Sequence, residues 1–210
     1  MDWVTVIREE AKKSSVLRAD ELAQKYRVGY PSVTQALSRQ AERGLVEHVG
    51  SKIYFNRLAL EASPKDLVNV LRTRAYISLD SALREYGIST QSPRVLTCVT
   101  VERPYEFRGD SIAIRYRGIS PRLYWGFKEK ETRYSSYQIA EPEKALLDWI
   151  YLKLQDGVEP TLDELDFSHL KRSKLVEYAR RFPGTVLNCL VPVLITETFS
   201  AGDGSASATS

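Results

Sequence analysis

The chain has 210 residues, of which 43% are hydrophobic and 27% are charged, and its formal net charge is +3. This is the composition of an ordinary globular protein, long enough for one large domain or two small ones. No apolar run approaches the length of a membrane span, and residues 1–13 lack the apolar stretch of a secretory signal, so a cytoplasmic location is expected. The mild positive charge permits nucleic-acid binding without requiring it.

Catalytic and metal-binding chemistry find little support in the residue types present. With two histidines and two cysteines in the whole chain, a metal site or a histidine-based nucleophile is not expected. Cys98 and Cys189 stand far apart in apolar contexts, which is typical of free thiols in a reducing compartment. No glycine-rich phosphate loop ending in GK[ST] occurs. The sequence therefore predicts a protein that is not an enzyme and needs no metal or cofactor.

Three helices are predicted in the first 44 residues. An apolar stripe at helical spacing predicts the first over residues 3–13, and a short extended piece follows at 16–18. The second helix begins near Asp20 and ends near Tyr26. A turn of three residues containing a glycine leads into the third helix at residues 30–44. Two helices joined by such a turn are typical of a helix-turn-helix.

The third helix, YPSVTQALSRQAERG, has the features of a recognition helix. Pro31 fits the first turn, where no N–H is needed, and Gly44 fits the position after the last turn. One face is small and apolar, whereas the other carries short hydrogen-bonding side chains and Arg39. Such side chains allow a helix to lie close to base edges in the major groove. Residues 45–49 and 53–55 then alternate as two strands around a turn, which predicts a wing.

A second, α+β domain is predicted over residues 63–199, after a winged helix-turn-helix DNA-binding domain over residues 1–62. A connector helix over residues 57–72 is expected to be interrupted or restarted at Ser63 and Pro64. Ser78 is a plausible N-cap of the short helix that ends at Gly87. The sheet of this domain is expected to be small and mainly antiparallel.

Several short strands and helices complete the second domain. Strands are predicted at 95–101 and 112–117, and further short strands at 123–127 and 136–139. Residues 142–152, apolar nearly all round, predict a buried helix in which Lys144 and Asp148 pair. The same pairing and helix capping account for three tempting carboxylates, Glu141, Glu143 and Asp148. A helical region is predicted over residues 166–182.

The last part of the chain is the hardest to interpret. Residues 186–199 fit a helix or a strand, and Pro192 argues against an unbroken helix. Residues 200–210 contain no large apolar side chain, which is typical of a disordered tail or a cloning remnant.

The proposed docking brings the third helix N-terminus first into the major groove. Arg39 then reads guanine and Gln35 reads adenine, the pairings that their geometry favours. Short polar side chains of the same helix contact phosphates, as do cations beside the turn, and the wing tip touches phosphate or minor groove. The predicted DNA-binding residues are Lys25, Arg27, Tyr30, Ser32, Thr34, Gln35, Ser38, Arg39, Ser51 and Lys52.

Three segments carry a resemblance to a known family. They are the winged helix ending RGLVEHVGSKIYF, the segment YISLDSALREYGI and the helix start AEPEKALLDWIYL, the most specific of the three. The chain resembles the AbiEi family, which comprises the antitoxins and transcriptional autoregulators of type IV toxin–antitoxin systems. The resemblance implies a repressor whose N-terminal domain binds inverted repeats in the promoter of its own operon. It also implies a C-terminal domain that counteracts a nucleotidyltransferase-like toxin without forming a stable complex with it.

Two further questions stay open at this level. Arg115 and Arg117 share one strand face, either as solvated side chains or as additional nucleic-acid contacts. A stand-alone regulator that senses a small ligand, without a toxin partner, is the alternative function. A pocket for that ligand would draw on aromatic residues of the second domain, which otherwise belong to its core or an interface. These aromatic residues are Tyr105, Phe107, Tyr124, Trp125 and Phe127.

The oligomeric state is expected to be simple. The sequence has no heptad repeat, so two monomers or a weak dimer are expected to pair on the DNA.

Overall fold

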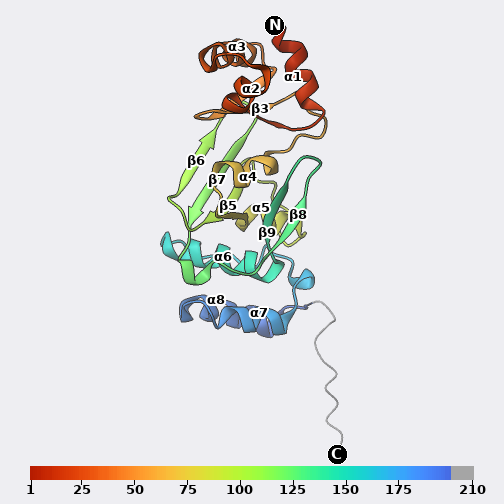
Figure 1. Ribbon diagram of the computed structural model, residues 1–210. Helices are drawn as coiled ribbons and strands as arrows, with labels where there is room; N and C mark the ends of the chain where they lie inside the picture. Colours follow the sequence, from red (N-terminus) through yellow and green to blue (C-terminus); the bar gives the residue numbers. More distant parts are fainter. Residues whose placement is uncertain (200–210) are drawn as a thin grey trace, which may run out of the picture.

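The computed structural model describes residues 1–199, so the tail predicted at 200–210 lies outside the described residues (Figure 1). The described part is mixed α+β, with eight α-helices, a small antiparallel sheet and a larger mixed sheet. Within residues 1–199, no helix combines the length and the apolar character needed to cross a membrane. The two cysteines of this part are free thiols, as predicted.

Residues 3–56, here called the N-terminal unit, form three helices and three strands. Each element lies within two residues of its predicted bounds, because each is specified by local periodicity and by nearby turn residues. In chain order they are α1 (Trp3–Ala11), β1 (Val16–Arg18), α2 (Ala19–Tyr26), α3 (Tyr30–Glu42), β2 (Val46–Gly50) and β3 (Ile53–Asn56).

The small sheet has the strand order β1-β3-β2, and its side chains enter two hydrophobic cores, one on each face. Val46 and Tyr54 point toward the helices, where they pack with Leu37 of α3. Val49 and Phe55 instead belong to the main hydrophobic core, which the rest of the chain builds. The N-terminal unit therefore shares a packed face with the remainder of the protein.

Residues 64–199, here called the large unit, contain a six-stranded sheet and most of the helices. The elements are η1 (Pro64–Leu67), α4 (Val68–Leu71), β4 (Ala75–Ile77), α5 (Leu79–Glu85), β5 (Leu96–Thr100), β6 (Tyr105–Arg108), β7 (Ala113–Gly118), η2 (Pro121–Leu123), β8 (Phe127–Glu131), β9 (Ser136–Ala140), α6 (Pro142–Gln155), η3 (Phe167–His169), α7 (Arg172–Ala179) and α8 (Gly184–Thr196).

The large sheet has six strands, so the prediction of a small sheet is wrong, but three of its five strand pairs are antiparallel, in line with the prediction of a mainly antiparallel sheet. Its order is β6-β7-β5-β4-β9-β8, and the pairs β5–β7 and β4–β9 are parallel. These pairs join strands that are separated by other elements in the sequence, which local patterns cannot predict. On one face, the Tyr116 hydroxyl donates to the Val68 carbonyl of α4 at 2.9 Å. On the other, Tyr76 reaches α6, and α7 and α8 form a further layer beyond α6 (Figure 1).

Three local predictions differ from the structure. The prediction of a connector helix is wrong for residues 57–62. The helical part begins only at η1, where Ser63 and Asp66 form a capping box. The strand expected at 123–127 begins instead at Phe127, after the short η2. Helix α8 continues through Pro192, because a proline removes one hydrogen bond and packing of the other turns holds the helix together.

The predicted pairing of Lys144 with Asp148 is confirmed, and the pair is fully buried in the large unit. The Asp148 carboxylate also accepts hydrogen bonds from the hydroxyls of Tyr76 and Ser78, each at 2.9 Å. Ser78 stands at the N-cap position of α5, but its side chain makes no capping bond and serves Asp148 instead. Burial lowers the pKa of the Lys144 ammonium and raises the pKa of the Asp148 carboxyl, whereas their mutual attraction opposes both shifts.

A buried glutamate fastens the N-terminal unit to the large sheet. Glu47 of β2 is 6% exposed and accepts a hydrogen bond from Arg57 Nη2 at 2.6 Å and another from the Ser111 hydroxyl. Burial alone would raise the pKa of Glu47, but these hydrogen bonds lower it below its ordinary value. A Cβ at Gly109 would collide with the Glu47 carboxylate and the tip of the Phe107 ring, so a larger residue there would require these side chains to shift.

Asp66 of η1 is a second point of attachment. Its Oδ2 accepts hydrogen bonds from the Ser15 hydroxyl at 2.6 Å and from the Ser63 N–H at 3.0 Å. Its Oδ1 accepts from the hydroxyls of Thr132 and Ser135 in the β8–β9 turn. One buried carboxylate thus joins the N-terminal unit, the connecting segment and the large sheet.

Candidate nucleic-acid interface

Helix α3 is held by one apolar face and by a specific stop. Val33 and Leu37 are fully buried against the other helices of the N-terminal unit. The helix ends at Glu42, and Gly44 follows with a φ of 73°, a conformation that favours glycine. The Gly44 N–H donates to the Ala41 carbonyl at 2.8 Å. The orientation of the outer face is therefore fixed by the core.

The outer face of α3 carries the polar side chains that the sequence predicts there. Ser32, Gln35, Ser38 and Arg39 are all exposed, and none of these side chains has a hydrogen-bond or ion-pair partner within residues 1–199. Thr34 differs, because it is half-buried and its hydroxyl donates to the Pro31 carbonyl at 2.9 Å. Four of the five predicted polar groups are thus available to a ligand without breaking an internal bond.

The turn between α2 and α3 places two cations beside the start of α3. Arg27 adopts the left-handed conformation with a φ of 54°, and its side chain is exposed without a partner in the described chain. Lys25 is exposed as well, with Nζ 2.5 Å from Glu10 Oε1. The Glu10 side chain is only 13% exposed and also accepts a hydrogen bond from the Tyr26 hydroxyl at 2.6 Å, so Lys25 is less free to meet a ligand than Arg27.

The tip of the β2–β3 hairpin lies next to the beginning of α3. The Lys52 carbonyl accepts the N–H of Ala19 at 2.9 Å, which fixes the tip to the start of α2. Lys52 Nζ lies 5.7 Å from the centre of the Tyr30 ring and 3.3 Å from Asp20 Oδ2. Ser51 is exposed beside it. The structure therefore brings Lys52, Ser51 and Tyr30 together, although Asp20 partly neutralises this lysine.

The sequence interpretation missed Arg43, which has the same properties as Arg39. It directly follows α3, is exposed and has no side-chain partner in residues 1–199. Because residues four apart lie on one helix face, Arg43 continues the line of Arg39. The sequence could have indicated this residue, because Arg43 stands four residues after Arg39 at the end of the predicted helix.

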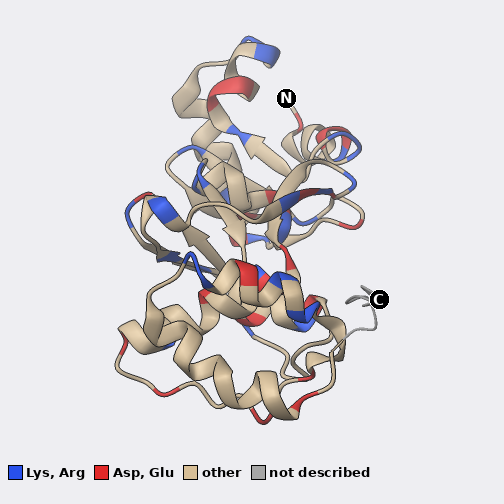
Figure 2. Cartoon of the chain, turned by 90° about the horizontal axis from the view of Figure 1, so that it is seen from below, with Lys and Arg blue, Asp and Glu red and all other residues tan. Residues whose placement is uncertain are grey.

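The two arginines of β7 are engaged in ion pairs. Arg115 Nε lies 2.9 Å from Glu106 Oε2 on the neighbouring strand, and Arg117 Nη2 lies 2.8 Å from Asp156 Oδ1 beyond α6. Figure 2 shows basic and acidic residues interspersed over the chain rather than gathered on separate sides. The structure therefore places these arginines apart from the α3 face and balances their charge locally.

The five aromatic residues considered for a ligand pocket pack against the main core. All are half-buried, and the rings of Tyr124 and Phe127 contact each other with their centres 5.0 Å apart and their planes tilted by 60°. Within residues 1–199 no cluster of three or more histidine, cysteine, aspartate or glutamate side chains is arranged to hold a metal ion. Comparison with known proteins finds neither a matching family model nor a matching curated protein.

Proposed function

We propose that the N-terminal unit is a winged helix-turn-helix that binds double-stranded DNA, with α3 in the major groove and the β2–β3 hairpin as the wing. The observation that carries the proposal is the outer face of α3, where Gln35 and Arg39 are exposed and without internal partners. An arginine and a glutamine that are free of internal partners are suited to bidentate hydrogen bonds with guanine and adenine.

The roles follow from the chemistry of each side chain. Arg39 presents a planar pair of donors to guanine, and Gln35 presents one donor and one acceptor to adenine. Ser32, Ser38 and Tyr30 donate to phosphate oxygens, which fixes register. The remaining phosphate contacts come from cations around the turn, the helix end and the wing tip, namely Lys25, Arg27, Arg43 and Lys52 with Ser51, and from Thr34 once its hydroxyl turns outward.

The biological role in this proposal depends on the resemblance of the whole chain to the AbiEi family. In this proposal the protein is a non-enzymatic repressor of its own operon, and two monomers pair on an inverted repeat. The large unit counteracts a nucleotidyltransferase-like toxin.

Two experiments test these roles. A footprint on the DNA upstream of its own gene, repeated at several salt concentrations, tests repression. Rescue of growth when a neighbouring toxin gene is induced tests the antitoxin role. Binding without sequence preference would remove the repressor proposal.

Replacing Arg39 by alanine is expected to weaken operator binding by about 1–3 kcal/mol and to relax the base preference at one position. The measurement is a titration of labelled operator and of single-base variants of it. Arg8→Ala is the matched control, because Arg8 is an exposed arginine of α1 in the same unit. Unchanged operator affinity for Arg39→Ala would contradict the proposed docking.

Replacing Lys52 by alanine is expected to lower the affinity for DNA by the same factor whatever its sequence. The steepness with which the logarithm of the binding constant falls with the logarithm of the salt concentration is expected to decrease by about one. The wing-tip lysine contacts phosphate in this proposal, so its loss removes one released counterion. Lys12→Ala serves as control, because Lys12 pairs with Glu9 on the surface of α1. A loss confined to one base position would show that Lys52 reads sequence instead.

A further inference from the structure

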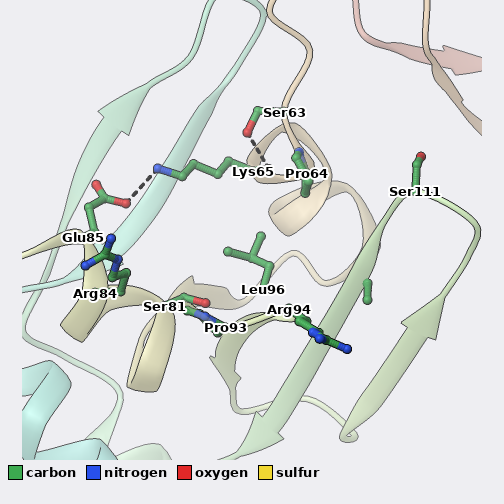
Figure 3. Close-up of a pocket in the computed structure, with 11 residues that line it drawn as sticks. Ser63, Pro64, Lys65, Ser81, Arg84, Glu85, Pro93, Arg94, Leu96 and Ser111 are labelled. Atoms are coloured by element: carbon green, nitrogen blue, oxygen red, sulfur yellow. Dashed lines mark hydrogen bonds and ion pairs between the residues drawn. The ribbon is translucent and has the colours of Figure 1, made fainter. Parts of the chain in front are cut away.

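The cavities of the large unit differ in how their charged side chains are engaged. In a cavity of about 460 Å³, shown in Figure 3, Glu85 already pairs with Lys65 and Lys130. Arg84 and Arg94 lie on opposite sides of this view, so they do not converge on one ligand group. Another cavity, of about 250 Å³, is lined by charged side chains of both signs that do not pair with one another.

This second cavity lies between two helices and two loops. It is lined by Asp80 of α5, by Trp149 and Lys153 of α6, and by Gln91 and Glu164 from the loops that follow α5 and precede η3. Its volume is below the range of pockets that hold drug-sized ligands, so it suits a smaller molecule. Most of its exposed lining is polar, which favours a charged or strongly hydrogen-bonding occupant.

The Trp149 indole carries a carboxylate at its edge and an ammonium over its face. Trp149 Nε1 donates to Asp80 Oδ1 at 2.9 Å, and Lys153 Nζ lies 4.9 Å from the ring centre. Asp80 and Lys153 thus line one cavity, yet they form no ion pair with each other in the described chain. Asp80 Oδ2 and the Lys153 ammonium have no hydrogen-bond partner among residues 1–199.

A second carboxylate is provided by Glu164. Gln91 Nε2 donates to Glu164 Oε2 at 3.2 Å, which joins the two loops and leaves Oε1 without a partner in the described part of the chain. The charged groups that line the cavity are therefore two carboxylates and one ammonium. A ligand that matches all of them carries two positive groups and one negative group, because each charge is best satisfied by a hydrogen-bonded counter-charge.

We propose that this cavity binds a free basic α-amino acid such as lysine or ornithine. The ligand carboxylate pairs with Lys153, and its two ammonium groups pair with Asp80 and Glu164. A diamine would leave Lys153 facing positive charge only, and a neutral amino acid would leave one carboxylate unmatched. The site goes beyond the proposed DNA binding and does not depend on it.

Calorimetric titration of the full chain with L-lysine and L-ornithine tests the site. Saturable binding of at least one of them is expected. Two partial ligands identify the groups that matter, because cadaverine lacks the carboxylate of lysine and L-norleucine lacks its side-chain ammonium. Each is expected to bind more weakly than lysine by about tenfold or more, since each loses one charged hydrogen bond.

Two variants test the assigned contacts. Lys153→Met and Glu164→Gln are each expected to lower the affinity for the amino acid by about tenfold or more. Lys153→Met is also expected to remove the preference for lysine over cadaverine, because the partner of the carboxylate is gone. The matched controls Lys171→Met and Glu129→Gln change exposed residues outside the cavity and are expected to bind as wild type.

Thermal unfolding checks that each variant is folded. Glu164 is exposed on a loop, so Glu164→Gln keeps the test decisive even where Lys153→Met is unstable. Absence of binding by both amino acids at millimolar concentration would overturn the proposal. Equal affinity for cadaverine would overturn it as well, because the cavity would then attract cations without recognising a carboxylate. Unchanged affinity in Glu164→Gln would place the ligand elsewhere and show the site to be wrong.

Discussion

Replacing Asp148 by alanine is expected to lower the free energy of unfolding by about 3–5 kcal/mol, the usual effect of breaking a buried ion pair. The cause is the Lys144 ammonium, which would remain fully buried without its counter-charge. Tyr76 and Ser78 would lose an acceptor at the same time. Chemical denaturation of the full chain, followed by far-UV circular dichroism, measures the change.

Two further variants separate the effect of charge from that of packing. Lys144→Met/Asp148→Leu/Tyr76→Phe removes both charges and the hydroxyl between them, and its stability is expected to be closer to wild type than that of Asp148→Ala. Glu9→Ala breaks the exposed pair with Lys12 and is expected to cost less than about 1 kcal/mol. Equal losses for Asp148→Ala and Glu9→Ala would show that burial does not make the Lys144–Asp148 pair costlier to break.

Replacing Asp66 by alanine is expected to cost about 2–4 kcal/mol, because several buried donors lose their acceptor together. These donors are the hydroxyls of Ser15, Thr132 and Ser135 and the N–H of Ser63. Since they belong to different parts of the chain, the loss is expected to loosen the contact between the two units. Hydrogen exchange should increase at β1 and at the β8–β9 turn.

Asp163→Ala is the matched control for Asp66→Ala, because Asp163 is an exposed aspartate of a loop. It is expected to change stability by no more than about 0.5 kcal/mol. Faster exchange confined to η1 would show that Asp66 acts only as a helix cap and does not connect the units.

Elements whose bounds are set by neighbouring residues could be predicted from the sequence. Contacts between residues far apart in the sequence could not. The bounds of α3 follow from Pro31, from the spacing of Val33 and Leu37 and from Gly44, all within 15 residues of one another. The spacing of Lys144 and Asp148 likewise indicated their pairing. Its full burial depends on Tyr76 and Ser78, about 70 residues away in the sequence.

The candidate sites divide in the same way. The exposed face of α3 was predictable, because helical periodicity alone decides which side chains point away from the core. The attachment of Glu47 to Ser111 was not predictable, because it joins segments that are 64 residues apart in the sequence and meet only in the folded chain.

The double attachment of the N-terminal unit through Glu47 and Asp66 bears on how two molecules would share one operator. A recognition helix on a flexible linker could bind half-sites at many different spacings. Here α3 is carried by a unit that packs against the large sheet, so each bound molecule would present its large unit at one fixed angle to the DNA axis. The permitted spacing between half-sites would then be set by the outline of the large units, and operators with too few intervening base pairs would hold one molecule only.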